Sequence, residues 1–223
     1  MGVKGERSAW RPMEIEMDSL DLQGRNIVHL QGVPVLKNIR TGEFGVNPND
    51  VMKVQLRILA EQENVEPRDI SLLALLRASV GSFQVNCLHN RYRLNKMLFY
   101  QWKELEKIGL GEAYDHDVFQ AKSKGPVPIH LDEDIRRLQE KGLVKVTIDQ
   151  WGKKSYQGSK DTELTPKGKK IAQEILSRLP EDFIQITAEV KKKLYNLDPS
   201  SIKDKVHREY PEYRTGYTEE DNE

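Results

Sequence analysis

The order of apolar patterns between residues 68 and 180 constrains the fold of this chain more than any other feature of its sequence. Three segments repeat apolar residues with a helical period, one alternates as a half-buried strand, and a polar stretch then leads to a second strand and a last helix. The three helical segments are residues 68–80, residues 92–108 and a helix with Leu131, Ile135 and Leu138 on one face. The strands are residues 144–148 and 162–164, with the polar stretch 150–160 between them, and the last helix runs from Lys167 to Pro180. They predict a helical unit that carries a hairpin with a long polar tip.

This order is that of a winged helix-turn-helix domain, a variant of a motif known for docking on DNA, and the polar stretch is then the wing. We therefore expect an α+β fold that is mainly α. Residues 81–90 are expected to be a connector between helices. The predicted parts are an N-terminal module over residues 1–66, a winged-helix domain over 67–180, a helical extension over 181–214 and an acidic tail over 215–223.

The N-terminal module is predicted to be a small β/α unit. Residues 1–23 show no clear periodicity, and we expect a flexible arm or a partly ordered lead-in there. Residues 26–30 and 33–39 are β-prone runs around Gln31-Gly32, a pattern that favours a small hairpin. The capping side chains of residues 47–50 then predict a helix from Val51 to about Gln62. In the C-terminal extension, a helix over 182–194 is a candidate contact for a homodimer, because winged-helix regulators commonly pair.

The composition excludes several classes of protein. Thirty-five basic residues balance thirty-five acidic ones, so no overall field draws the chain to nucleic acid or to an anionic membrane, and such binding needs a local patch. The longest apolar stretch, residues 70–76, is far shorter than the roughly 20 residues of a membrane span. Cys87 is the only cysteine, which excludes an internal disulfide framework and a zinc site built from cysteines. We expect a cytoplasmic protein without a signal peptide.

Two sets of motifs resemble known families of regulators. Leu164, Thr165 and Gly168 match the junction that follows the wing in winged-helix regulators of the multiple-antibiotic-resistance and phenolic-acid repressor kinds. Residues 93–100, Arg-Leu-Asn-Lys-Met-Leu-Phe-Tyr, together with Gly125-Pro126, resemble the Panacea-like, antitoxin-like winged-helix families more closely. The resemblance spans residues 70–179 and implies regulation or neutralisation of a partner, with no catalytic residues to carry over.

A candidate contact with duplex DNA lies on the predicted wing. Residues 150–160 contain no acid, and their lysines and aromatic residues suit contacts with phosphates. Lys167, at the start of the following helix, can extend the same positive patch. A solvated hairpin tip explains the lysines equally well. The candidate residues of the wing are Trp151, Lys153, Lys154, Tyr156 and Lys160.

The predicted recognition helix weakens the case for DNA. Asp132, Glu133 and Asp134 crowd its first turn, which usually faces the bases, although carboxylates there also favour the helix dipole. The candidate base contacts that remain are His130, Arg136, Arg137 and Gln139. A regulator that binds duplex DNA is thus the first hypothesis. An antitoxin-like or adaptor protein that acts through a protein partner is the alternative.

Signals for catalysis and for cofactors are weak in this sequence. Asp115-His116-Asp117 offers possible metal ligands, but neighbouring side chains diverge, and a polar loop is the expected structure. Cys87 and His89 are too close in sequence to suggest a nucleophile and its base, and a structural cysteine is commoner. The chain has no glycine-rich phosphate loop and no HExxH motif. We expect no enzyme, no cofactor and no metal.

Overall fold

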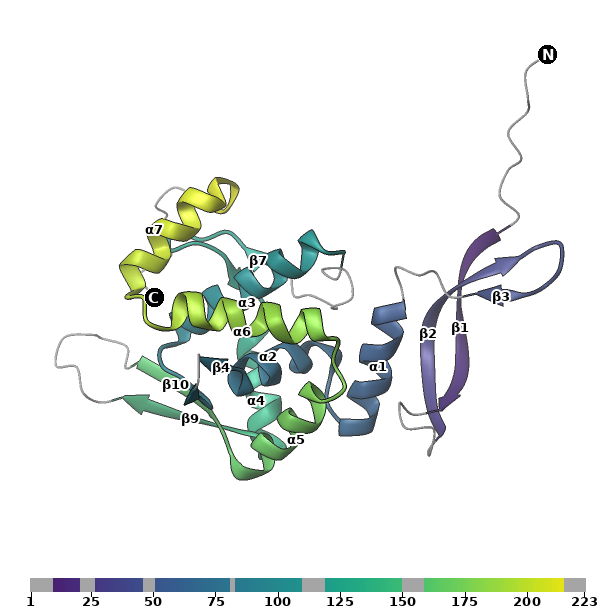
Figure 1. Ribbon diagram of the computed structural model, residues 1–223, viewed down its shortest axis with the longest axis horizontal. Coiled ribbons are helices and arrows are strands. Elements are labelled where there is room, and N and C mark those ends of the chain that lie inside the picture. The colour runs from purple at the N-terminus through teal and green to yellow at the C-terminus, as the bar shows by residue number, and fades with distance from the viewer. Residues whose placement is uncertain are drawn as a thin grey trace, which may run out of the picture.

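The computed structural model describes residues 10–20, 27–45, 51–80, 83–109, 119–149 and 159–214. Over these residues the fold is mixed α+β and mainly helical, with small sheets. A body of helices occupies one side of the molecule, and a long β-hairpin lies beside α1 at the other (Figure 1). None of the described helices is both long and apolar enough to cross a membrane.

The N-terminal hairpin differs from the predicted one. Strand β1 (Trp10–Leu20) pairs antiparallel with β2 (Ile27–Asn38), and β2 also pairs with β3 (Phe44–Gly45). A flexible arm is therefore wrong for residues 10–20, and the predicted turn at Gln31-Gly32 is wrong. The register passes from Ile15 opposite Val33 to Met17 opposite Leu30, so two residues of β2 face one residue of β1. The glycine thus belongs to a β-bulge inside one strand, because a bulge and a turn share the same local signal.

The next two helices pack against each other, and the first of them lies beside β2 (Figure 1). Helix α1 (Val51–Glu63) confirms the predicted segment, and α2 (Pro67–Arg77) ends three residues earlier than predicted. After α2 the short strands β4 (Ser79–Val80) and β5 (Phe83–Gln84) pair antiparallel. Residues 69–76 of α2 are all buried, so this helix is enclosed on every side.

A three-stranded antiparallel sheet carries the predicted hairpin. Its order is β6–β10–β9, where β6 is Cys87–Leu88, β9 is Val144–Asp149 and β10 is Ser159–Leu164. The predicted strands at 144–148 and 162–164 are confirmed, with Leu164 opposite Val144 and Lys160 opposite Ile148. Residues 83–90 connect α2 to α3 as predicted, but the two-residue strands β5 and β6 within them were not predicted. A two-residue strand has too few positions to show alternation, and its pairing comes from distant residues.

The remaining helices agree closely with the apolar periodicity. Their bounds are α3 (Arg91–Lys107), α4 (Leu131–Glu140), α5 (Pro166–Leu176), α6 (Glu181–Tyr195), α7 (Pro199–Glu209) and a 3-10 turn, Pro211–Tyr213; the small pair β7 (Phe119–Gln120) and β8 (Val127–Pro128) lies between α3 and α4. The core extends from Leu56 of α1 to Val206 of α7. Apolar packing therefore crosses both ends of the predicted 67–180 unit.

The junction between β10 and α5 depends on a close approach of two backbones. Thr165 is the N-cap of α5, and its Oγ1 accepts a hydrogen bond from the Gly168 N–H at 3.0 Å. A Cβ atom on Gly168 would lie 1.9 Å from the backbone O of Leu143. Only glycine fits there without a shift of the backbone. The glycine of the Leu-Thr-x-x-Gly pattern is therefore explained by the contact of α5 with the residue before β9.

Helix α3 buries a wider face than its apolar stripe predicts. The apolar period of residues 92–108 places Leu94, Leu98, Trp102 and Leu105 on one side; Leu94 and Leu105 are fully buried, whereas Leu98 and Trp102 are only partly buried. Phe99 and Tyr100 on an adjoining side are fully buried. The reason is that α3 contacts α6 and α7 as well as α2, so the extension covers a side that the predicted packing left open.

A buried ammonium group fastens α6 to the rest of the core. Lys191 is fully buried, and its Nζ donates to the backbone oxygens of Leu76 at 2.8 Å, Ala78 at 2.8 Å and Val85 at 2.6 Å. These carbonyls lie at the end of α2 and just before β6. The side chain thus donates to three backbone acceptors at the end of α2 and between β5 and β6.

Replacing Lys191 with Met is expected to lower the free energy of unfolding by at least about 3 kcal/mol, because buried carbonyls lose their donor. Lys192→Met is the matched control: this lysine is the next residue of α6 and is exposed, so its removal should change the stability by less than about 0.5 kcal/mol. Urea unfolding of both variants measures the difference. Equal midpoints would contradict the role of Lys191.

A second buried lysine lies on α3. Lys96 is fully buried, and its Nζ donates to the backbone O of Pro126 at 2.7 Å and lies 4.8 Å from the centre of the Tyr92 ring. Burial lowers the pKa of Lys96 to about 7. The ordinary lysine pKa in an unfolded chain is about 10.4. Between these values the unfolded chain holds a proton that the folded chain has released.

The free energy of unfolding should therefore rise with pH above about pH 7, by up to about 1.4 kcal/mol per pH unit from Lys96. In Lys96→Met the free energy of unfolding should rise less steeply with pH. The rise that remains comes from Lys191, because burial also lowers the pKa of this lysine to about 7. Denaturant unfolding between about pH 7.5 and 9.5 measures the slope. The exposed Lys203→Met serves as control, and equal slopes in all three proteins would contradict the assignment.

Candidate functional site

Helix α4 presents one apolar and one polar face, as the sequence predicts for a recognition helix. Leu131, Ile135 and Leu138 are buried against the core. The exposed residues of the helix are Asp132, Glu133, Arg136, Gln139 and Glu140. Arg91 of α3 donates to the Asp132 carboxylate at 2.6 Å, and the exposed His130 at the N-cap has Nδ1 3.6 Å from Glu133 Oε2.

Arg137 has a structural role that its sequence position does not reveal. Its guanidinium donates through Nη2 to Asp69 Oδ1 at 2.7 Å and through Nε to Asp69 Oδ2 at 3.2 Å. Nη2 also donates to Asp134 at 2.8 Å. Burial opposes the positive charge, but hydrogen bonds and charges from both carboxylates outweigh it and raise the pKa of Arg137. The residue joins α4 to α2, so that of the two adjacent candidates only Arg136 lies on the exposed face of the helix.

The basic residues predicted to contact DNA fall into three groups in the structure. Lys160 of β10 and Arg136 of α4 are exposed. Lys167 is exposed too, but its Nζ donates to the backbone O of Lys141 at 2.9 Å and so caps the end of α4. The wing-tip candidates lie outside the described residues; they are Trp151, Lys153, Lys154 and Tyr156. In the described structure Lys160, opposite Ile148, thus lies at the end of the hairpin next to residues 150–158, one pair from Ser159 and Asp149.

Arg137→Ala is expected to lower the free energy of unfolding by roughly 3 kcal/mol, because it leaves the fully buried Asp69 carboxylate without its cation. Arg136→Ala removes the same side chain one position earlier, from the exposed face, and should change stability by less than about 0.5 kcal/mol. Thermal and urea unfolding of the pair test this. If both variants have the same melting temperature and urea midpoint, the Arg137 ion pairs contribute nothing measurable to the free energy of unfolding.

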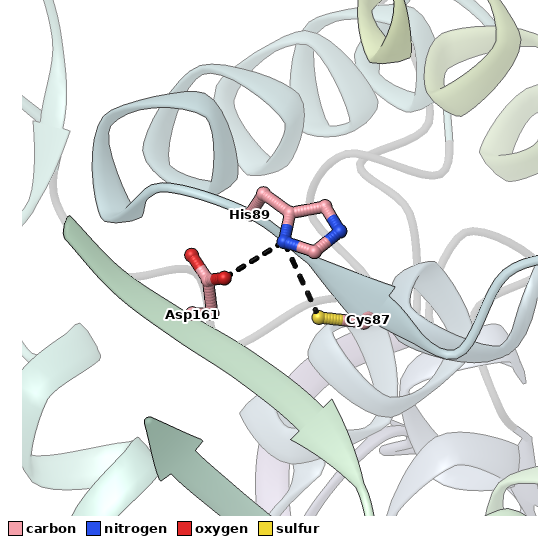
Figure 2. A group of neighbouring side chains, drawn as sticks. All are labelled: Cys87, His89 and Asp161. Carbon is pink, nitrogen blue, oxygen red and sulfur yellow. Dashed lines mark hydrogen bonds and ion pairs between the residues drawn. The ribbon is translucent and has the colours of Figure 1, made fainter. Parts of the chain in front are cut away.

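A cluster that sequence reasoning missed lies where β6 and β10 meet the start of α3 (Figure 2). His89 Nδ1 lies 2.7 Å from Asp161 Oδ2 and 3.9 Å from Cys87 Sγ. Asp161 Oδ1 accepts a hydrogen bond from the backbone N–H of Asn90, the N-cap of α3, at 2.9 Å. Asp161 was not among the predicted site residues, because only the pairing of β6 with β10 brings it to His89.

The cluster does not have the geometry of a nucleophile, base and carboxylate. In such a triad the nucleophile and the carboxylate use different ring nitrogens of the histidine, whereas Cys87 and Asp161 both face Nδ1 here. Burial, with the charges of Asp161 and Glu163, raises the pKa of the Cys87 thiol to about 11. A thiol of this kind is a poor nucleophile. The other candidate from the sequence, residues 115–117, lies outside the described residues.

Comparisons of the chain with protein-family models, with curated proteins and with solved structures found no match. The resemblance to the Panacea-like, antitoxin-like families therefore stays a prediction from the sequence motifs.

Proposed function

We propose that the chain contains a winged-helix domain and is a regulator that binds duplex DNA without catalysis. The observation that carries the proposal is the order α2, β6, α3, α4, β9, β10, interrupted only by the short pairs β4–β5 and β7–β8, together with the sheet order β6–β10–β9. A helix that directly precedes a two-stranded hairpin is the recognition element of the winged variants of the helix-turn-helix. Helix α4 has this place, and its apolar face is fixed on the core.

The proposed DNA surface joins the hairpin to the exposed face of α4. Lys160 and the lysines of the wing tip supply contacts with phosphates, which bind every sequence alike. Arg136 and Gln139 are exposed side chains of types that contact bases in the major groove. The ion pair of Asp132 with Arg91 reduces the negative charge at the start of α4.

One observation favours a protein partner as the second candidate. Glu133 and Glu140 are exposed on α4 together with Asp132, so carboxylates outnumber the single exposed arginine of that helix. Carboxylates repel phosphate and suit a basic protein surface. An antitoxin-like or adaptor role, in a homodimer or with a different chain, is the corresponding function.

A salt-dependent titration against random duplex DNA tests the first proposal. The logarithm of affinity should fall linearly with the logarithm of salt concentration, and Lys153→Ala/Lys154→Ala should make the slope shallower by about 0.9 for each phosphate that the variant no longer neutralises. Lys192→Ala/Lys203→Ala removes the same charge from exposed positions of α6 and α7 and should leave the slope unchanged. Arg136→Ala should alter the preference among sequences more than the overall affinity.

Two results would contradict this assignment. If the parent shows no salt-dependent binding of duplex DNA, the protein-partner function becomes the better account. If the wing double variant and the control double variant weaken DNA binding equally, DNA contacts the protein surface without a defined site, and the wing lysines are not specific phosphate contacts.

A further inference from the structure

Four side chains with metal-binding groups share one face of the β6–β10 pair. Cys87 and His89 are two positions apart, as are Asp161 and Glu163, and residues two apart on a strand point to the same side. Glu163 is the cross-strand partner of Cys87, and the same register continued by two residues places Asp161 opposite His89. The antiparallel pairing thus converts two short patterns, Cys-x-His and Asp-x-Glu, into one cluster.

We propose that Cys87, His89 and Asp161 bind a divalent transition-metal ion, for which Zn²⁺ is the best chemical fit. The donor atoms are a sulfur, an imidazole nitrogen and a carboxylate oxygen, and all three lie within 4.8 Å of one another. Zn²⁺ accepts each of these donors, whereas Ca²⁺ and Mg²⁺ prefer oxygen alone. The inference is independent of whether the protein binds DNA.

The spacing of the donor atoms suits a tetrahedral ion. With ordinary bond lengths, Zn²⁺ holds sulfur, nitrogen and oxygen ligands about 3.3 to 3.6 Å apart. The observed separations bracket this range, at 2.7 Å for His89 Nδ1 to Asp161 Oδ2 and 3.9 Å for Cys87 Sγ to His89 Nδ1. Cys87 Sγ and Asp161 lie within 4.8 Å of each other, so binding requires the side chains to rotate around the ion. Figure 2 shows the Cys87 and Asp161 side chains directed toward the same edge of the His89 ring.

The surroundings orient the carboxylate and leave a way in for the ion. Asp161 Oδ1 is held by the backbone N–H of Asn90, so Oδ2 is the oxygen that faces His89. A hydrogen bond to a metal-binding carboxylate from a group that does not itself bind the metal fixes the orientation of that carboxylate. The His89 side chain is 57% exposed and that of Asp161 15%, so the cluster borders solvent. Glu163 pairs with Lys145 at 2.9 Å, which leaves three protein ligands and a fourth position for water.

Bound metal would connect the edge strand β6 to the central strand β10 beside the start of α3. Binding converts the Cys87 thiol to the thiolate and releases its proton to solvent. Because the two strands share only two residue pairs, a cross-link here should raise the melting temperature of the whole chain.

The test is titration of the full chain, first stripped with a chelator, with Zn²⁺ and with Co²⁺ as a spectroscopic probe. We expect one ion per chain, a higher melting temperature, and a thiolate-to-cobalt charge-transfer band. Cys87→Ser should abolish that band. His89→Gln and Asp161→Asn should each weaken Zn²⁺ binding by more than about 100-fold, because removal of a ligand costs more than the 10- to 100-fold typical of changes behind the ligands.

Controls separate metal binding from folding. Asp161→Asn keeps an oxygen acceptor for the Asn90 N–H, and His130→Gln changes the histidine at the N-cap of α4, outside the cluster. The metal-free variants should melt with the metal-free parent, and His130→Gln should bind Zn²⁺ like the parent. If Zn²⁺ does not bind the parent, or binds it no more tightly than His89→Gln, the cluster is only a hydrogen-bonded cap of α3 and the proposal is wrong. A cobalt spectrum without the thiolate band would equally overturn it.

Discussion

The double pairing of strand β10 is the constraint on which the rest of the structure depends. β10 lies between β9 and β6, so it connects the hairpin to residues more than seventy positions earlier in the chain. Its last residue leads into Thr165, whose backbone N–H donates to the Leu143 oxygen at 3.0 Å. Gly168 then allows α5 to approach that same carbonyl. One strand thus sets the position of α5, the end of α4 and the start of α3.

Arginine, aspartate and lysine side chains inside the molecule hold the helices in place, including the helix of the surface proposed to bind DNA. Arg137 and Asp69 connect α4 to α2, and Lys191 connects α6 to the end of α2 and to Val85 just before β6. A buried charge without a partner is strongly destabilising, so these contacts permit few alternative packings. The exposed face of α4 is therefore held by ion pairs beneath it as well as by its apolar residues.

Local patterns were enough to predict most of the helices and the hairpin. The starts of α1, α4 and α5 follow from capping residues, prolines and helical period, and β9 follows from alternation. Strand β1 carried a signal that was missed: Met13, Ile15 and Met17 alternate with acidic residues. Its partner β2 was divided in two because the glycine of a bulge has the same signature as a turn.

The candidate sites depend more on contacts between distant residues than the helices do. Arg136 and Arg137 are adjacent and chemically identical, and only the packing of α4 on α2 separates an exposed arginine from one bound to a buried carboxylate. The sequence shows Cys87 and His89 two positions apart, but nothing near them points to Asp161. The pairing of β6 with β10 creates that cluster, and a two-residue strand shows no periodicity from which to predict it.

Hydrogen–deuterium exchange of the full chain, with and without a random duplex, tests most directly whether the hairpin and α4 form a DNA surface. We expect slower amide exchange over residues 144–164 and the exposed turns of α4 when the duplex is present, with unchanged exchange in β1, β2, α6 and α7. Protection confined to the N-terminal hairpin or to the C-terminal helices, or no protection at all at low salt, would contradict the proposed function.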